Sequence, residues 1–204
     1  MKKIKKTQLN CNAAASDIST DIEKYIYNTI AEQTRLDFDR TFCTLDVEVL
    51  PKAENLYVAI VELDPHLNIF GLMTNTYTRK KLIDTSNADI QLKNCDSLIN
   101  LIMLDYLYNL RDVMEARINW KLHKNYYGDT GVEVQVERPL SEYKPYTATI
   151  QTLSIIDPET KVRKNGLTTQ IAFDPTSDSI EDGIYQFLDY IDRAFKRAGR
   201  SDID

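Results

Sequence analysis

Three stretches of the chain carry apolar residues at helical spacing. In the first, isoleucine recurs at every fourth position from Ile18 to Ile30, which places these side chains on one face of a helix. In the last, large apolar residues from Ile180 to Phe195 also share one face. The predicted helices span residues 17–36, 96–126 and 179–198.

The middle helix has an unusual pattern. Between Leu98 and Leu110 its apolar residues occupy nearly every face, whereas beyond Leu110 they form a single stripe. We take Asp96 as its N-cap and Gly128 as the residue that stops it. A helix on one sheet hides about half of its circumference. The residues from Leu98 to Leu110 are therefore either the centre of one core or partly an oligomer interface.

The segments between the helices have the patterns of strands. Leu45, Val47 and Val49 alternate with polar residues, which predicts a half-buried strand, and the apolar run 56–63 predicts a central one. With the run 69–78 as a third strand, residues 43–78 form an antiparallel meander, followed by a loop with at most one short strand. A second group, residues 132–174, contains a long hairpin with a charged tip.

The order of these elements sets the fold class. Strands cluster in two antiparallel groups instead of alternating with helices, which predicts an α+β fold. We expect an N-terminal arm over residues 1–15 and a single domain over residues 16–204. The two halves resemble each other in the order of their elements, but we find no repeat in their residues.

Composition narrows the class of protein. The net charge of −6 argues against sequence-independent binding of nucleic acid, which needs clustered cations. Three scattered cysteines without a CxxC pair indicate a reducing compartment. The chain has no apolar run long enough for a bilayer. We therefore expect a protein of cytoplasmic origin that binds other proteins, as a homo- or hetero-oligomer, and no membrane.

Motifs of catalysis are missing from the sequence. The six glycines form no phosphate-binding loop, and two histidines do not suggest a zinc site. We predict no cofactor, no metal and no enzymatic activity. The alternative is a small carboxylate-dependent enzyme, with Mg²⁺ as an optional ion, built on the pairs Asp37 with Asp39 and Asp129 with Glu133.

Aromatic residues gather around the end of the middle helix, and cations lie in the hairpin tip. Tyrosine and tryptophan are favoured at protein interfaces, although packing between this helix end and a sheet explains them as well. Stacking on nucleic acid ranks below both, because few cations are interleaved. The interface candidates are Trp120, Tyr126, Tyr127, Tyr143, Tyr146, Lys161, Arg163 and Lys164.

These observations lead to a hypothesis about function. We expect a non-enzymatic structural or assembly subunit of a larger oligomeric complex. The generous use of Ile, Asn, Asp, Tyr and Lys with little Gly is common in AT-rich genomes and favours a bacteriophage tail, neck (connector) or baseplate component, which would place the protein in a virion. A regulatory protein-binding module is the other alternative.

Overall fold

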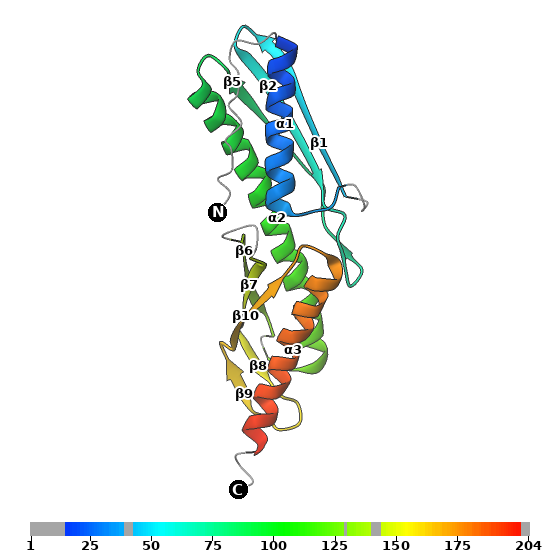
Figure 1. Cartoon of the computed structure of the whole chain (residues 1–204). Coiled ribbons are helices and arrows are strands. Elements are labelled where there is room, and N and C mark those ends of the chain that lie inside the picture. The colour runs from blue at the N-terminus through cyan, green and yellow to red at the C-terminus, as the bar shows by residue number, and fades with distance from the viewer. Residues whose placement is uncertain (1–14, 39–42, 129, 140–143, 201–204) are drawn as a thin grey trace. The chain divides into compact units, whose positions relative to one another are not determined.

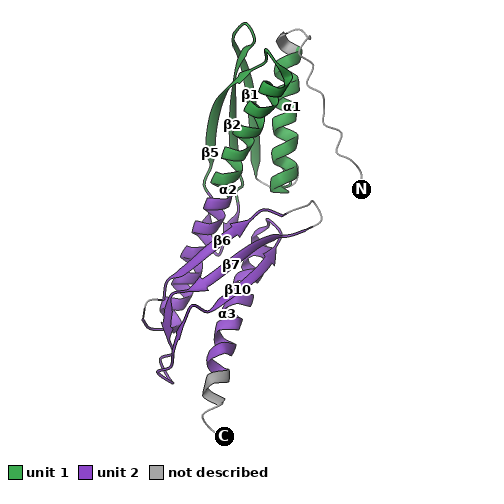
Figure 2. Cartoon of the chain, turned by 90° about the vertical axis from the view of Figure 1, so that its left-hand side faces the viewer, with its two compact units in different colours: residues 1–66, 75–106 green, residues 67–74, 107–204 purple. Residues whose placement is uncertain are grey.

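The computed structural model describes residues 15–38, 43–128, 130–139 and 144–200, so the expected N-terminal arm lies almost wholly outside it. Three helices and several antiparallel sheets confirm the α+β class. The chain divides into two compact units, which Figure 2 colours separately. The single domain over residues 16–204 stays a prediction, since compactness does not show whether the units fold alone.

Unit 1 is a three-stranded antiparallel sheet with two helices. Helix α1 (Ala15–Thr34) precedes strands β1 (Thr44–Ala53), β2 (Leu56–Asp64) and β5 (Tyr77–Asp84), and α2 (Ala88–Asn125) follows them. The strand order β1-β2-β5 confirms that the strand with apolar residues on both faces is central. Alternate residues of β2 are buried, so one face of the sheet packs against the helices.

Unit 2 repeats this plan with the second part of α2, from Leu107 onward. Strands β6 (Val132–Glu137), β7 (Tyr146–Thr152) and β10 (Thr168–Phe173) form the sheet, and α3 (Ser177–Arg200) ends the unit. In Figure 1 these strands lie to the left of α2 and α3, and the buried residues of β7 alternate with exposed or half-buried ones. The second predicted β group, residues 132–174, is thus confirmed.

In both sheets the chain forms a short hairpin between the second and third strands. The first hairpin pairs β3 (Asn68–Ile69) with β4 (Leu72–Met73), and the second pairs β8 (Ser154–Ile156) with β9 (Arg163–Asn165). The first hairpin belongs to unit 2, where the backbone N–H of Asn68 donates to the Ser177 hydroxyl at 3.1 Å.

The prediction that run 69–78 is the third strand of the meander was wrong. Phe70 and Gly71 both have positive φ and make the tight turn between β3 and β4. Glycine adopts this conformation without a steric penalty. The third strand of the sheet is β5, which begins with the last two residues of that run, Tyr77 and Thr78, and continues to Asp84 in the segment that the sequence marked as a loop.

The predicted start of the middle helix at Asp96 was also wrong. Helix α2 begins at Ala88, and the Asn87 side chain accepts a hydrogen bond from the backbone N–H of Asp89 at 2.8 Å. Asp96 lies inside the helix, where its carboxylate accepts a hydrogen bond from the Tyr25 hydroxyl at 2.6 Å. A good capping residue therefore serves here to join two helices.

The two units share more than the order of their elements. Helix α3 starts from the cap Thr176 as α2 starts from Asn87, each three residues after a strand ends. Counted from these caps, five positions are buried in both helices, and five more are buried in both α1 and the second part of α2 with the residue that follows it. The buried pairs are Ile18/Leu110, Ile22/Met114, Ile26/Ile118, Ile30/Leu122, Thr34/Tyr126, Gln91/Ile180, Cys95/Ile184, Leu98/Phe187, Ile102/Ile191 and Tyr106/Phe195.

A pair of carboxylates extends this correspondence to the edge strands. Glu23 follows Ile22 in α1 and accepts a hydrogen bond from the backbone N–H of Val49 in β1, at 3.0 Å. Glu115 follows Met114 in α2 and accepts one from Val134 in β6, at 2.9 Å. Unpaired N–H groups of an edge strand invite pairing with another chain. Both units therefore use a helical glutamate to satisfy such a group on their first strand.

Candidate interaction surfaces

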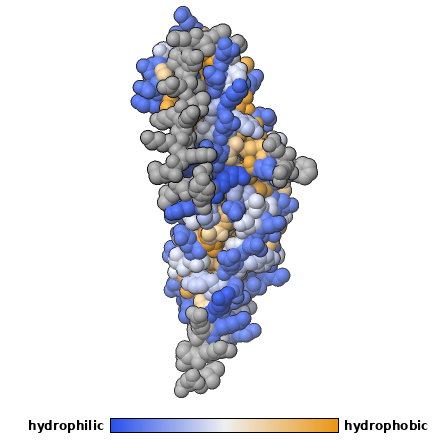
Figure 3. Space-filling view, viewed as in Figure 1, coloured by the Kyte–Doolittle hydropathy of each residue, from blue (hydrophilic) through white to orange (hydrophobic). Residues whose placement is uncertain are grey.

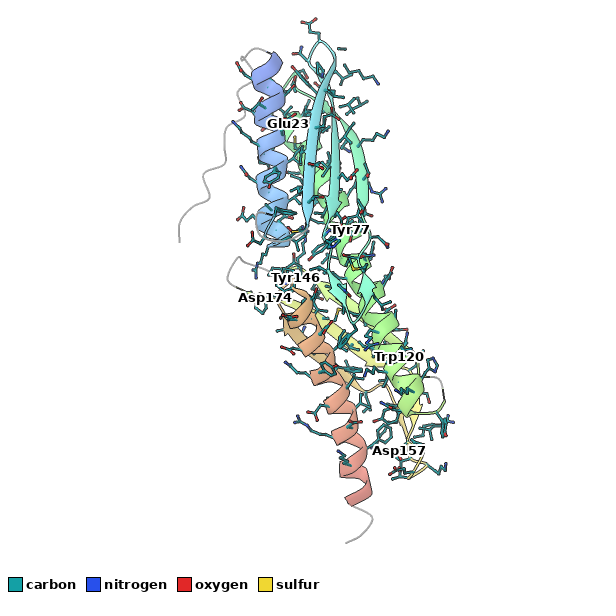
Figure 4. All side chains as sticks on the ribbon, turned by 90° about the vertical axis from the view of Figure 1, so that its right-hand side faces the viewer. Glu23, Tyr77, Trp120, Tyr146, Asp157 and Asp174 are labelled. Carbon is teal, nitrogen blue, oxygen red and sulfur yellow. The ribbon has the colours of Figure 1, made fainter. Side chains whose placement is uncertain are left out.

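The structure separates the eight predicted interface residues into exposed and buried groups. Trp120 and Tyr127 are 51% and 61% exposed, and Lys161 and Arg163 are exposed too, with Lys164 half-buried. Tyr126 and Tyr146 are buried, and Tyr143 lies outside the described residues. Figure 4 labels Trp120 on the last turns of α2.

Tyr146 is part of the core because of its place in β7. It alternates with half-buried threonines and shares its face with Ala148 and Ile150. Its ring stacks on Phe173 of the neighbouring strand, with 5.8 Å between the centroids. Tyr126 has a different role, since its hydroxyl donates to Asp192 at 2.5 Å and joins α2 to α3. Burial and the nearby Asp192 carboxylate raise the pKa of Tyr126.

Trp120 collects three cations around its indole ring. The Arg117 guanidinium lies 4.5 Å from the ring centroid, and the ammonium groups of Lys121 and Lys124 each lie 5.4 Å away. The spacing i, i+3, i+4 and i+7 brings these four residues together on the helix. We call them the basic–aromatic surface. Lysine near a helix C-terminus complements the helix dipole, but three cations on one ring concentrate positive charge beyond that need.

Arg117 is held between two aromatic rings, and no described carboxylate forms an ion pair with it. Its guanidinium lies 4.3 Å from the ring centroid of Phe70, on the opposite hairpin, and its Nε is buried without a hydrogen-bond partner among the described residues. The corresponding pair in unit 1 is Tyr25 with Asp96, which form a hydrogen bond. Where unit 1 has Asp96, unit 2 has Tyr185, whose ring packs edge-on against Phe70. The charge of Arg117 is therefore not neutralised within the described part of unit 2.

The β8–β9 hairpin adds a further cation close to this helix end. Asp157 accepts hydrogen bonds from the backbone N–H groups of Thr160 and Glu159, and the first of these is the main reason that the pKa of Asp157 is lowered. This turn fixes Lys161, whose ammonium lies 5.8 Å from the ring centroid of Tyr127. Tyr127 in turn exchanges two backbone hydrogen bonds with Ile156, so the hairpin is anchored to the end of α2.

Helix α3 exposes the opposite charge. Asp178, Asp182 and Asp189 recur on its exposed side, and Tyr185 lies among them with about half of its surface exposed. Asp189 pairs with Arg193 on the same helix. The structure shows no ion pair of Asp178 or Asp182 with another described residue. We call Asp178, Asp182, Tyr185 and Asp189 the acidic stripe.

The open face of the unit 1 sheet carries an apolar row. Leu50, Val58 and Leu82 are register partners across β1, β2 and β5, on the face that no helix of unit 1 covers. Leu50 and Leu82 are 45% and 47% exposed. The equivalent face in unit 2 carries the polar row Gln135–Thr149–Gln170. Unit 1 therefore offers apolar surface where unit 2 does not.

The apolar part of α2 is mostly core. Most of its large residues are buried, but they are divided between the two units and not at the centre of one core, and Leu101, Leu104 and Tyr108 are exposed. In the view of Figure 3, orange side chains interrupt the hydrophilic surface at several separate places. No helix in the described part of the chain is long and apolar enough to cross a membrane.

The carboxylates of the enzyme hypothesis are only partly placed. Asp37 and Glu133 are exposed and belong to different units, and Asp39 and Asp129 lie outside the described residues. Among the residues that are described, no three His, Cys, Asp or Glu side chains come together as metal ligands would. His123 makes a contact of 2.6 Å from Nδ1 to the Thr130 hydroxyl. The described residues therefore do not form a carboxylate site that would support the enzyme hypothesis.

Cys95 gives a prediction about stability at alkaline pH. Its thiol is fully buried, and burial together with the neighbouring Asp96 raises its pKa from 9.0 to about 12. Because the folded state keeps the proton, this stabilisation is complete below pH 9 and is lost as the pH rises toward 12. From pH 8 to pH 10 we expect Cys95 to cost about 1.4 kcal/mol in the free energy of unfolding.

Urea denaturation of the wild type and of Cys95→Ala at both pH values measures this cost. The buried tyrosines titrate in both proteins and cancel in the comparison. An equal pH dependence of the two proteins would show that the thiol ionises freely in the folded state.

Comparisons with known proteins identify no relative. The chain matches no family model, and searches of curated proteins and of solved structures found no match either.

Proposed function

We propose that this protein is a structural subunit that assembles with other proteins and does not catalyse a reaction. The observation that supports this most is the apolar row Leu50–Val58–Leu82 on the open sheet face of unit 1. Single exposed apolar residues are common on monomeric proteins, whereas neighbouring ones that form a larger patch are a feature of contact surfaces. Burial of these side chains against a partner would contribute roughly 25 cal/mol per Å² of apolar area.

Substitution of the row tests the proposal. We expect the wild type to be larger than its 23.5 kDa monomer in size-exclusion chromatography with light scattering, or to capture a partner in stoichiometric amount. Leu50→Lys/Leu82→Lys should weaken that association, because two ammonium groups would have to be desolvated in the contact. Both positions are exposed, so the fold should tolerate the change.

Gln135→Lys/Gln170→Lys is the matched control. It adds the same two charges to the open sheet face of unit 2 and should leave the association intact. A wild type that stays monomeric at all accessible concentrations and captures no stoichiometric partner contradicts the proposed function. Equal loss of association in the control would move the contact away from unit 1.

We also propose a setting for the assembly, a bacteriophage tail, neck or baseplate. Its support is the composition of the chain, rich in Ile, Asn, Asp, Tyr and Lys, together with the contact surface described above. Mass spectrometry of purified virions from the source of the sequence is the direct measurement. Detection at a fixed ratio to the other virion proteins is the expected result, and absence from the particles excludes this setting.

A further inference from the structure

Two surfaces of unit 2 carry opposite charge, and apart from Asp189 their charged side chains form no ion pair with a described residue. The basic–aromatic surface holds Arg117, Lys121 and Lys124 around one indole, and the structure shows no ion pair of these cations with a described carboxylate. In the acidic stripe, Asp178 and Asp182 likewise form no ion pair with a described cation. Because the chain has a net charge of −6, a local cluster of cations points to a negatively charged binding partner.

The two surfaces match in spacing as well as in charge. Arg117 and Lys121 are one helical turn apart, as are Asp178 and Asp182, so each pair spans about 6 Å along its helix axis. One further turn along each helix comes Lys124 or Tyr185, the latter about half exposed. Trp120 lies between its cations as a large apolar ring of the kind that anchors protein contacts.

We propose that the basic–aromatic surface of one copy of this protein binds the acidic stripe of a second copy. The proposal rests on the assembly function and names one partner in it, a further copy of the chain. Helix α2 of one copy lies against α3 of the other, with Trp120 at the centre and the lysine–aspartate pairs around it. Charge pairs of this kind set the register and the rate of association.

Charge reversal tests both halves of the contact. Analytical ultracentrifugation of the wild type at low and high salt should show self-association that weakens as salt screens the charges. Lys121→Glu/Lys124→Glu should raise the dissociation constant by about tenfold or more, and Asp178→Lys/Asp182→Lys should do the same. All four positions are exposed or half-buried, and circular dichroism with thermal melting verifies that each variant is folded.

Mixing the two variants is the decisive arm. The first variant keeps a native acidic stripe and the second keeps a native basic–aromatic surface, so an equimolar mixture should associate although neither variant does so alone. General loss of positive charge is controlled by Lys24→Glu/Lys93→Glu, at exposed positions of α1 and α2 in unit 1, which should behave as the wild type.

The outcomes separate this proposal from the proposed function. If the wild type associates and all charge variants associate equally well, this contact is overturned and the assembly function stands. If the wild type is monomeric at every salt concentration and captures no other protein, both are overturned. If the wild type stays monomeric but binds a 30-nucleotide oligothymidine through Lys121 and Lys124, the surface serves nucleic acid and the contact between copies is overturned.

Discussion

Replacement of Phe187 by alanine is expected to lower the free energy of unfolding by about 3–5 kcal/mol. Phe187 is fully buried on α3, at the position that Leu98 occupies on α2. Its removal leaves a cavity between α3 and the sheet of unit 2. Close packing limits how far that cavity can collapse, because Gly183 already lies so near Ile171 that a methyl group in place of its hydrogen would clash with Cδ1.

Urea denaturation measures this loss, and the thermal midpoint should fall by roughly 6–20 °C in a chain of this size. Gln186→Ala, at the exposed neighbouring position, is the control and should change the free energy by less than about 0.5 kcal/mol. A loss below about 1 kcal/mol for Phe187→Ala would mean that this ring does not fill the core of unit 2.

Glu115→Ala is expected to cost about 1–3 kcal/mol, although the side chain is only half-buried. The cost arises because the backbone N–H of Val134 loses the carboxylate that accepts its hydrogen bond at 2.9 Å. Glu115→Gln retains an acceptor oxygen and should recover most of the loss. Urea denaturation provides the measurement, with an unchanged m-value as evidence that only the native bond was affected.

Glu23→Ala repeats the experiment in unit 1, where Val49 is the donor. We expect a loss of the same size, since the two glutamates hold equivalent positions. Losses under about 0.5 kcal/mol in both alanine variants would mean that solvent satisfies these N–H groups equally well.

Much of the fold could be predicted from periodicity, because long amphipathic helices leave a strong pattern. The stripe from Ile18 to Ile30 defines α1, and apolar residues on both faces identify β2 as the central strand. The first two turns of α2 escaped notice because residues 88–94 mix polar and apolar side chains without a clear face. The β3–β4 hairpin was missed because Ile69 and Phe70 pack in unit 2, which no local pattern can reveal.

The repeated plan was hidden for a related reason. Of the ten buried helical pairs, two are identical, Ile26 with Ile118 and Ile102 with Ile191. The other eight pairs differ in identity and some differ widely in size, such as Thr34 with Tyr126, so the buried position is kept while the residue that occupies it is not. A comparison of residues finds little, whereas a comparison of burial finds all ten pairs.

The candidate surface was found only in part. The sequence pointed to Trp120 and Tyr127, which are exposed, but also to Tyr146, which lies on the buried face of β7 with Ala148. The cations around Trp120 were overlooked because few cations seemed to alternate with the aromatic residues. The pattern Arg117, Trp120, Lys121 and Lys124 at i, i+3, i+4 and i+7 is the signal that could have revealed them.

Because α2 belongs to both units, a change in this helix should affect the stability of both. Its residues up to Tyr106 complete the hydrophobic layer of one unit, and those from Leu107 complete the layer of the other. The 38 residues of this one helix thus contribute to the hydrophobic cores of both units. A proline substitution or a proteolytic cut in α2 should therefore destabilise both units, so we expect tolerance to mutation to be lowest in this helix.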